Sequence, residues 1–122
     1  MFPRAEGRGF GTLLRVRRLD PTEAHSRWAA GQLRIIDCRE QDEYETSRLE
    51  GVALIPMSEL AGRFEEIPDD LPLAVICRSG ARSARVASAL TGTGRFGDVA
   101  NLEGGIIAWA EEGLPYQGEE PT

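Results

Sequence analysis

Short apolar runs alternate with amphipathic stretches along most of the chain. The runs at residues 33–37, 52–55, 73–76 and 99–102 are largely continuous, and residues 13–19 suit a shorter, more charged edge strand. Continuous apolar runs are typical of strands that are buried on both faces. Because these runs alternate with helical segments, the pattern predicts an α/β fold with a mainly parallel sheet covered by helices on both faces.

Local signals place helices between these strands. Asp20 suits the N-cap position, Pro21 suits the first helical position and Glu23 can complete the cap, so a helix is predicted from there to Gly31. Parallel strands place their carboxyl ends on one edge of the sheet, where such folds bind ligands. Spaced apolar residues and helix-prone composition predict further helices over residues 41–47, 58–67, 84–90 and 106–110.

The pattern indicates one domain without internal repeats. Residues 1–12 carry glycines and charges with little apolar periodicity, which predicts a flexible N-terminal tail. The domain is predicted over residues 13–116, and residues 117–122 are expected to form a polar C-terminal tail. A length of 122 residues suits one ordinary domain with its own core.

Composition and charge argue against several classes of function. The net charge of −6 disfavours nonspecific nucleic-acid binding, and no apolar run is long enough to span a membrane. The first residues lack the apolar stretch of a secretory signal, and two cysteines are too few for a disulfide scaffold. Because neither cysteine has metal-ligand spacing and His25 is the only histidine, we expect no metal, no cofactor and a reducing cytoplasm.

Cys77 is the strongest candidate for chemistry. It follows the apolar run at 73–76 and precedes a helix-prone segment, so strand, tight loop and helix follow one another. Loop N–H groups and a helix N-terminus favour negative charge, which should lower the pKa of the Cys77 thiol. A cysteine that serves only packing needs no such surroundings. We therefore predict a nucleophilic Cys77 whose active-site loop consists of Arg78, Ser79, Gly80, Ala81 and Arg82.

Four segments resemble those of the rhodanese family, in the family's order and spacing. They are residues 35–44 with an Asp-x-Arg motif, the Gly-Val-Ala-Leu-Ile-Pro run at 51–56, the loop at 75–84, and residues 101–109 with Asn-Leu-Glu-Gly-Gly. The match covers roughly residues 13–116. Four ordered segments are far more specific than any single motif.

The resemblance implies a single-domain rhodanese with a five-stranded parallel sheet and thiosulfate sulfurtransferase activity. The Cys77 thiolate would take the outer sulfur of a small anionic donor such as thiosulfate, and sulfite would leave. A thiol or a protein acceptor would then receive the sulfur from the Cys77 persulfide. In this scheme Arg82 stabilises both the loop and the charge, and Arg78 faces solvent and attracts anionic donors.

Cys38 departs from the family pattern, where valine is usual, and Ala81 replaces a loop residue that is frequently polar. Packing like a small apolar residue is the favoured interpretation of Cys38. The alternative is a resolving thiol that attacks the Cys77 persulfide or forms a disulfide with Cys77, which requires Cα atoms within about 7 Å of each other. Asp37 and Arg39 could support the pocket, but an ion pair that fastens the strand end is favoured.

Two rival functions are weighed against sulfur transfer. A dual-specificity phosphatase on the same fold has a wider loop with five residues between cysteine and arginine, whereas four separate Cys77 from Arg82 here. A noncatalytic binding module for a protein partner is the second rival, although such relatives have generally lost the cysteine. A sulfur-relay protein that passes sulfur to another protein overlaps with the enzyme and stays open as an alternative.

Overall fold

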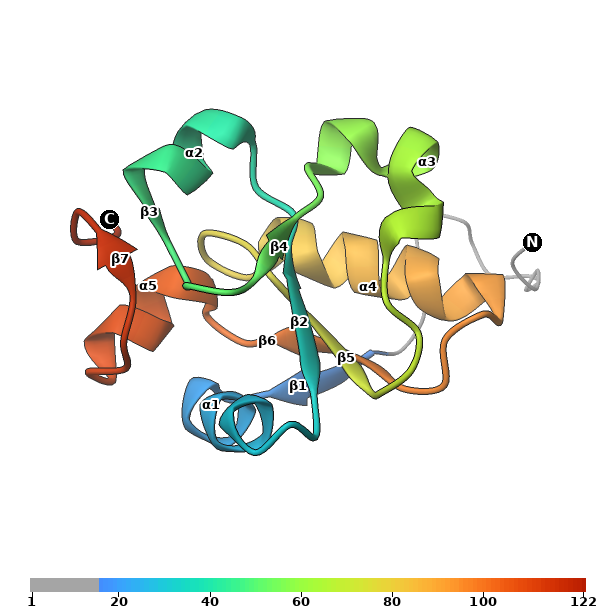
Figure 1. Cartoon of the computed structure of the whole chain (residues 1–122), viewed down its shortest axis with the longest axis horizontal. Coiled ribbons are helices and arrows are strands. Elements are labelled where there is room, and N and C mark those ends of the chain that lie inside the picture. Colours follow the sequence, from blue (N-terminus) through green and yellow to red (C-terminus); the bar gives the residue numbers. More distant parts are fainter. Residues whose placement is uncertain (1–15) are drawn as a thin grey trace.

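The computed structural model describes residues 16–122. The predicted tail at 1–12 and the first part of the predicted strand at 13–19 lie outside the described residues. Within residues 16–122, five parallel strands form one sheet in the order β1-β6-β5-β2-β4, which confirms the predicted α/β fold (Figure 1). The strands are β1 (Arg17–Leu19), β2 (Arg34–Asp37), β4 (Ala53–Leu54), β5 (Leu73–Ile76) and β6 (Val99–Leu102).

Helices cover both faces of the sheet. Side chains along each strand alternate between the two faces, so they contribute to two apolar clusters, one on each side of the sheet. Ile76 belongs to the cluster under α1 (Pro21–Ala29) and α5 (Gly105–Glu111). Val75 belongs to the cluster under α4 (Ala81–Thr93) and α3 (Leu60–Arg63). The described helices are α1 (Pro21–Ala29), α2 (Gln41–Thr46), α3 (Leu60–Arg63), α4 (Ala81–Thr93) and α5 (Gly105–Glu111), with 3-10 turns η1 (Met57–Glu59) and η2 (Phe64–Glu66) on either side of α3.

Helix α1 begins where the sequence signals predict. The Asp20 carboxylate accepts a hydrogen bond from the Glu23 N–H at 3.0 Å, and Pro21 is the first helical residue. Helix α4 begins at Ala81 and runs to Thr93, with Gly94 as its C-cap, so it extends beyond the predicted residues 84–90 at both ends. Helix α3 is much shorter than its predicted range, since the chain there divides into two 3-10 turns around a single helical turn.

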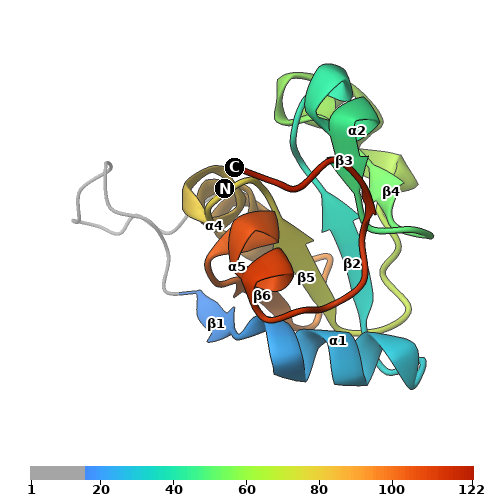
Figure 2. The ribbon, with the colours of Figure 1, turned by 90° about the vertical axis from the view of Figure 1, so that its left-hand side faces the viewer.

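The C-terminal segment, for which a polar tail is predicted over residues 117–122, pairs with another part of the chain. Strand β7 (Gln117–Gly118) lies antiparallel to β3 (Ser47–Arg48), and the Glu119 N–H donates to the Thr46 carbonyl at 2.9 Å. Figure 2 shows this segment passing from α5 around to the end of α2. The pairing joins segments about seventy residues apart, so a local pattern could not predict it.

Two neighbouring strands supply the residues of interest. Strands β2 and β5 pair in parallel, with Asp37 opposite Ile76, so Cys38 and Cys77 follow them on the same sheet edge. This confirms the predicted placement of the two cysteines at the carboxyl ends of parallel strands. In residues 16–122 no helix is both long enough and apolar enough to cross a membrane.

Candidate active site

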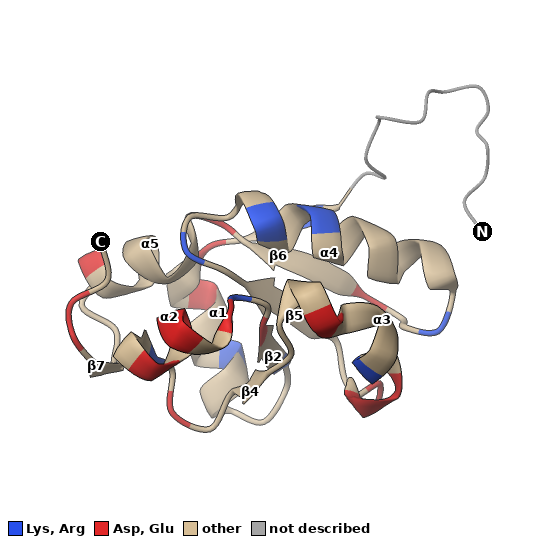
Figure 3. Ribbon diagram, turned by 90° about the horizontal axis from the view of Figure 1, so that it is seen from above, with Lys and Arg blue, Asp and Glu red and all other residues tan. Residues whose placement is uncertain are grey.

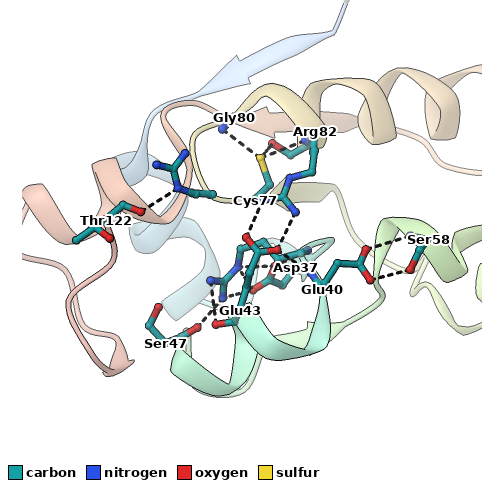
Figure 4. Close-up of polar contacts among 12 residues, drawn as sticks. Asp37, Glu40, Glu43, Ser47, Ser58, Cys77, Gly80, Arg82 and Thr122 are labelled. Carbon is teal, nitrogen blue, oxygen red and sulfur yellow. Dashed lines mark hydrogen bonds and ion pairs between the residues drawn. The ribbon is translucent and has the colours of Figure 1, made fainter.

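The Cys77 sulfur occupies the position of a helix cap. Gly80, at a φ of +106°, turns the chain into α4 and donates its N–H to Cys77 Sγ at 3.1 Å. The Ser83 N–H reaches the same sulfur at 3.3 Å, and the Ser83 hydroxyl lies 3.2 Å from it. These are the orphan donors of a helix N-terminus, which normally bind an oxygen acceptor. Here they converge on one sulfur atom (Figure 4).

The loop directs its N–H groups inward because its carbonyl groups are bound on the outside. The Ile106 and Ile107 N–H groups at the start of α5 donate to the carbonyls of Cys77 and Arg78 at 2.9 and 3.2 Å. Asn101 Nδ2 donates to the Gly80 carbonyl at 3.1 Å. Three loop carbonyls are thereby held away from the sulfur, so the anion meets donors rather than acceptors.

Gly105 makes this close packing of α5 against the loop sterically feasible. It has a φ of +64°, and a Cβ atom there would overlap the carbonyl oxygens of Arg78 and Cys77. A side chain at this position would therefore push α5 away from the loop. Gly105 is therefore required for the geometry of the site, as the loop residues are.

The side chains of Ser83 and Asn101 are hydrogen-bonded to each other beside the sulfur. The Ser83 hydroxyl lies 2.5 Å from Asn101 Oδ1 as well as 3.2 Å from Cys77 Sγ. A hydroxyl has one proton to donate, so it can serve only one of these acceptors at a time. When Cys77 is ionised, the charged sulfur is the stronger acceptor, and when Cys77 is a thiol its S–H can donate to Ser83 instead.

Cys77 is poised as a thiolate beside a protonated neighbour. The Cys38 thiol acting as a donor, together with the Ser83 hydroxyl and the N–H groups of Ser83 and Gly80, lowers the pKa of Cys77 to about 4, although burial opposes this. The same interaction with Cys77, together with burial, raises the pKa of Cys38 far above its ordinary value. Cys38 and Cys77 are 0% and 1% exposed, and both are free of disulfides.

The two loop arginines have partners that the sequence did not reveal. Both guanidinium nitrogens NH1 and NH2 of Arg82 contact the Glu43 carboxylate at 2.8 Å, which fastens α4 to α2 and lowers the pKa of Glu43 to about 2. Arg78 is exposed, as expected, and its Nε donates to the Thr122 carbonyl at 2.8 Å. Arg82 therefore links α4 to α2, and within residues 16–122 the hydrogen bonds to the Cys77 sulfur come from Gly80 and Ser83 instead.

Asp37 and Arg39 form a buried ion pair behind the loop. Arg39 donates from its backbone N–H, Nε and NH2 to the Asp37 carboxylate at 2.8 to 3.1 Å. Its remaining donors reach the carbonyls of Glu43 and Ser47, at the two ends of the α2–β3 corner. This is the predicted ion pair, and it holds in place the helix that carries Glu43.

A polar pocket of about 330 Å³ opens beside the loop. It lies between α2, the exposed Arg78 and the C-terminal segment, and its lining includes Asp42, Glu119 and Thr122. Figure 3 shows acidic residues on α2 and basic residues near the start of α4. The pocket is thus lined by one loop arginine together with several carboxylates, next to the loop that follows Cys77.

The structure brings together the predicted loop and adds three residues to it. Ser79 and Ala81 of the predicted loop are exposed, and within residues 16–122 the donors to the sulfur are Gly80 and Ser83 rather than these two residues. Ser83, Asn101 and Gly105 contact or shape the site although the sequence reasoning assigned them no role there. Their signal was present, since Ser83 follows the loop directly and the other two lie in the C-terminal motif.

The fold and the site define a class of α/β proteins in which a parallel strand delivers a cysteine thiolate into a loop of N–H donors at a helix N-terminus. The rhodanese-like domain model matches residues 20–112. The chain therefore belongs to the rhodanese-like domain family, which confirms the resemblance noted in the sequence.

Individual relatives agree with this assignment. A sulfurtransferase of Allochromatium vinosum is 40% identical over 86 residues, which cover 70% of this chain and 79% of that protein. A Mycobacterium tuberculosis protein named "Probable adenylyltransferase/sulfurtransferase MoeZ" is 35% identical over 86 residues, 69% of this chain but only 22% of its own length. The crystal structure of a Pseudomonas aeruginosa thiosulfate sulfurtransferase superposes with a TM-score of 0.75 at 29% identity, covering 84% of this chain and 20% of that one.

Proposed function

We propose that this protein is a sulfurtransferase that carries sulfane sulfur as a persulfide on Cys77. In the first step the Cys77 thiolate attacks the outer sulfur of thiosulfate, a Cys77–sulfur bond forms, the sulfur–sulfur bond of the donor breaks, and sulfite leaves. In the second step a thiolate or cyanide attacks the outer persulfide sulfur, and Cys77 departs as a thiolate. Each step forms one bond to the transferred sulfur and breaks one sulfur–sulfur bond, so no external oxidant or cofactor is needed.

The observation that carries this proposal is the convergence of the Gly80 and Ser83 donors on Cys77 Sγ. A persulfide is an anion whose charge lies one atom beyond Sγ, and the loop with the helix N-terminus offers it N–H donors. The depressed pKa of Cys77, about 4, keeps the nucleophile ionised at neutral pH. Thiosulfate fits as the donor because it is small and anionic, and it is the donor named for the structural relative above.

The acceptor is proposed to be a thiol, either small or borne by a protein. The polar pocket beside the loop is lined by Arg78 and by the carboxylates of Asp42 and Glu119, so it offers polar contacts to an incoming molecule. A cycle of this kind needs Cys77 reduced between turnovers, which is why we assign the protein to a reducing compartment such as the cytoplasm.

Intact mass spectrometry tests the proposal directly. The purified protein is incubated with thiosulfate, desalted, weighed, and then treated with cyanide, with Cys77→Ser as the matched variant. We expect one added sulfur atom on the wild type immediately after loading, stoichiometric sulfite, removal of the sulfur by cyanide, and no adduct on Cys77→Ser. The absence of both adduct and sulfite, while Cys77 remains reduced and alkylatable, would exclude thiosulfate as the donor.

The same measurement separates the alternatives. A protein that loads sulfur but turns over slowly with cyanide and small thiols, while passing sulfur to a protein thiol, would be a relay. A protein that takes sulfur neither from thiosulfate nor from inorganic polysulfide would instead be a binding module that has kept its cysteine.

A further inference from the structure

A second thiol lies beside Cys77 on the neighbouring strand. Strands β2 and β5 run parallel with Asp37 opposite Ile76, and the Cys38 N–H continues the ladder to the Ile76 carbonyl at 3.0 Å. The next residues in register are Cys38 and Cys77 themselves. Adjacent strands lie about 4.8 Å apart, which falls inside the range of about 4.4 to 6.8 Å between Cα atoms that a disulfide requires.

The two side chains also point to the same face of the sheet. Ile36, Cys38, Val75 and Cys77 all belong to the apolar cluster covered by α4, as the alternation of side chains along paired strands requires. The sulfur atoms therefore do not diverge across the sheet. The criterion that would have excluded a resolving thiol is not met.

Packing alone does not account for Cys38. A valine-like residue would need only the apolar cluster, yet Cys38 also lies next to Cys77 in the strand register, and the proximity of the two thiols lowers the pKa of Cys77. The result is an asymmetric pair in which Cys77 is the thiolate and Cys38 keeps its proton. In such a pair the thiolate can attack a sulfur donor, and the neighbouring protonated thiol can react in a later step.

The approach directions suit a displacement at Cys77. The donors from Gly80 and Ser83 contact Sγ from the loop and from α4, whereas Cys38 comes from strand β2 (Figure 4 shows the loop side of the sulfur). An outer persulfide sulfur held by the loop donors leaves the β2 side of the inner sulfur to Cys38. Transfer of the negative charge to the outer atom also removes the charge that kept Cys38 protonated.

We propose that Cys38 is a resolving thiol that attacks the inner sulfur of the Cys77 persulfide and releases hydrosulfide. This inference rests on the proposed persulfide and adds a second activity, the reduction of sulfane sulfur to sulfide. A Cys38–Cys77 bond forms, the bond between Cys77 and the outer sulfur breaks, and the Cys38 proton leaves with that sulfur as HS⁻. The two thiols are oxidised to a disulfide by two electrons, and the sulfane sulfur accepts those electrons, so no other oxidant takes part.

Repeated turnover would then require a thiol reductant that returns the Cys38–Cys77 disulfide to two thiols. A low-molecular-weight thiol attacks the disulfide to give a mixed disulfide, and a second thiol returns both cysteines to the reduced state. The net reaction consumes two thiols and one sulfane sulfur atom and yields hydrosulfide and an external disulfide. An acceptor that reaches the outer sulfur first would divert the cycle to ordinary sulfur transfer, so Cys38 competes with the acceptor.

The test is a single-turnover experiment without free thiol or oxygen. Wild type, Cys38→Ser and Cys38→Val are loaded with thiosulfate or with inorganic polysulfide, desalted, and followed by intact mass while a fluorogenic trap records sulfide. Cys38→Ser keeps a hydroxyl donor beside Cys77 but cannot form a disulfide, whereas Cys38→Val keeps only the packing. The folding of each variant is checked by its unfolding transition.

For the wild type we expect the added sulfur to disappear with one sulfide released, leaving a protein lighter than its reduced form by a pair of hydrogen atoms. The decay should be independent of protein concentration, and peptide mapping should find Cys38 joined to Cys77. In both variants the persulfide should last at least about tenfold longer, since the intramolecular nucleophile is gone.

The outcomes separate the two proposals. Equal persistence of the loaded sulfur in wild type and Cys38→Ser would overturn the resolving role and leave sulfur transfer intact. Failure of both donors to load any of the three proteins would remove the persulfide itself, and the resolving role with it. Sulfide release from Cys38→Ser at the wild-type rate would show that another group resolves the persulfide.

Discussion

Removal of the Ser83 hydroxyl should raise the pKa of Cys77 by an amount that can be worked out from the structure. The hydroxyl lies 3.2 Å from Cys77 Sγ, in a site where both residues are almost fully buried. A hydrogen bond to a charged group contributes about 1.5 to 3 kcal/mol. At about 1.4 kcal/mol for each pKa unit, Ser83→Ala should raise the pKa of Cys77 by about one to two units.

The starting value, about 4, places the expected pKa of the variant at about 5 to 6. Both proteins are then largely ionised at pH 7, so the thiolate fraction hardly changes there. Thiolate nucleophilicity rises with pKa, with a Brønsted coefficient of about 0.4 to 0.5. The limiting rate of alkylation should therefore increase in the variant, by roughly 2.5-fold to tenfold, even though the thiolate is less stable.

The assay is the rate of alkylation by iodoacetamide as a function of pH, read by intact mass. Cys38 does not interfere, because its raised pKa keeps it a thiol. Ser79→Ala is the matched control, since that loop serine is exposed and forms no hydrogen bond to the sulfur in the described part of the chain. A midpoint for Ser83→Ala that coincides with that of Ser79→Ala would refute the assignment of Ser83 as a donor to the thiolate.

Three further outcomes follow from the surrounding contacts. The folded pKa of Glu43, about 2, lies below its ordinary value of 4.5, so the stability that the Glu43 carboxylate contributes is present above about pH 4.5 and is lost as the pH falls toward 2. Glu43→Gln should therefore lower the free energy of unfolding in urea by about 1 to 2 kcal/mol at pH 7. The same variant should lower it by much less at pH 2.5. Gly105→Ala should lower the free energy of unfolding by about 2 to 4 kcal/mol and slow the loading of sulfur onto Cys77. Gly113 also has a positive φ but has open space around it, so the control variant Gly113→Ala should lower the free energy of unfolding by only about 1 to 2 kcal/mol and leave sulfur loading unchanged. Arg39→Met leaves the buried Asp37 carboxylate unpaired, so it should lower the unfolding free energy by about 3 to 5 kcal/mol, and a loss below about 1 kcal/mol would contradict the buried pair.

Local sequence patterns predicted the parts of the site that lie within one stretch of chain. The run from Leu73 to Cys77 is apolar and the segment after Gly80 is helix-prone, so strand, loop and helix follow from neighbouring residues alone. The carboxyl-edge rule for parallel strands also predicts that Cys38 and Cys77 lie on the same edge of the sheet, which the β2–β5 pairing confirms. These inferences succeed because short-range periodicity and chain direction determine them.

Contacts between distant segments were not predictable in the same way. Arg82 pairs with Glu43, and Ser83 shares its hydroxyl with Asn101, across 39 and 18 residues of chain. The pattern around Gly105 signals a turn but not which backbone it must approach. Each of these contacts depends on how helices dock on the sheet, and that docking is settled by tertiary packing rather than by local propensity.

The arrangement of charges around the loop bears on the choice between sulfur and phosphate. A phosphoryl group would need donors for several oxygens and a cation free to face them. Here the N–H donors of Gly80 and Ser83 meet at one sulfur atom, and the Arg82 guanidinium is turned toward the Glu43 carboxylate. An anion with a single charged atom beyond Sγ needs only the converging N–H groups, whereas a phosphate would also have to compete with Glu43 for Arg82. Under the proposed function, the preference for sulfur therefore depends on α2 as well as on the short spacing of the loop.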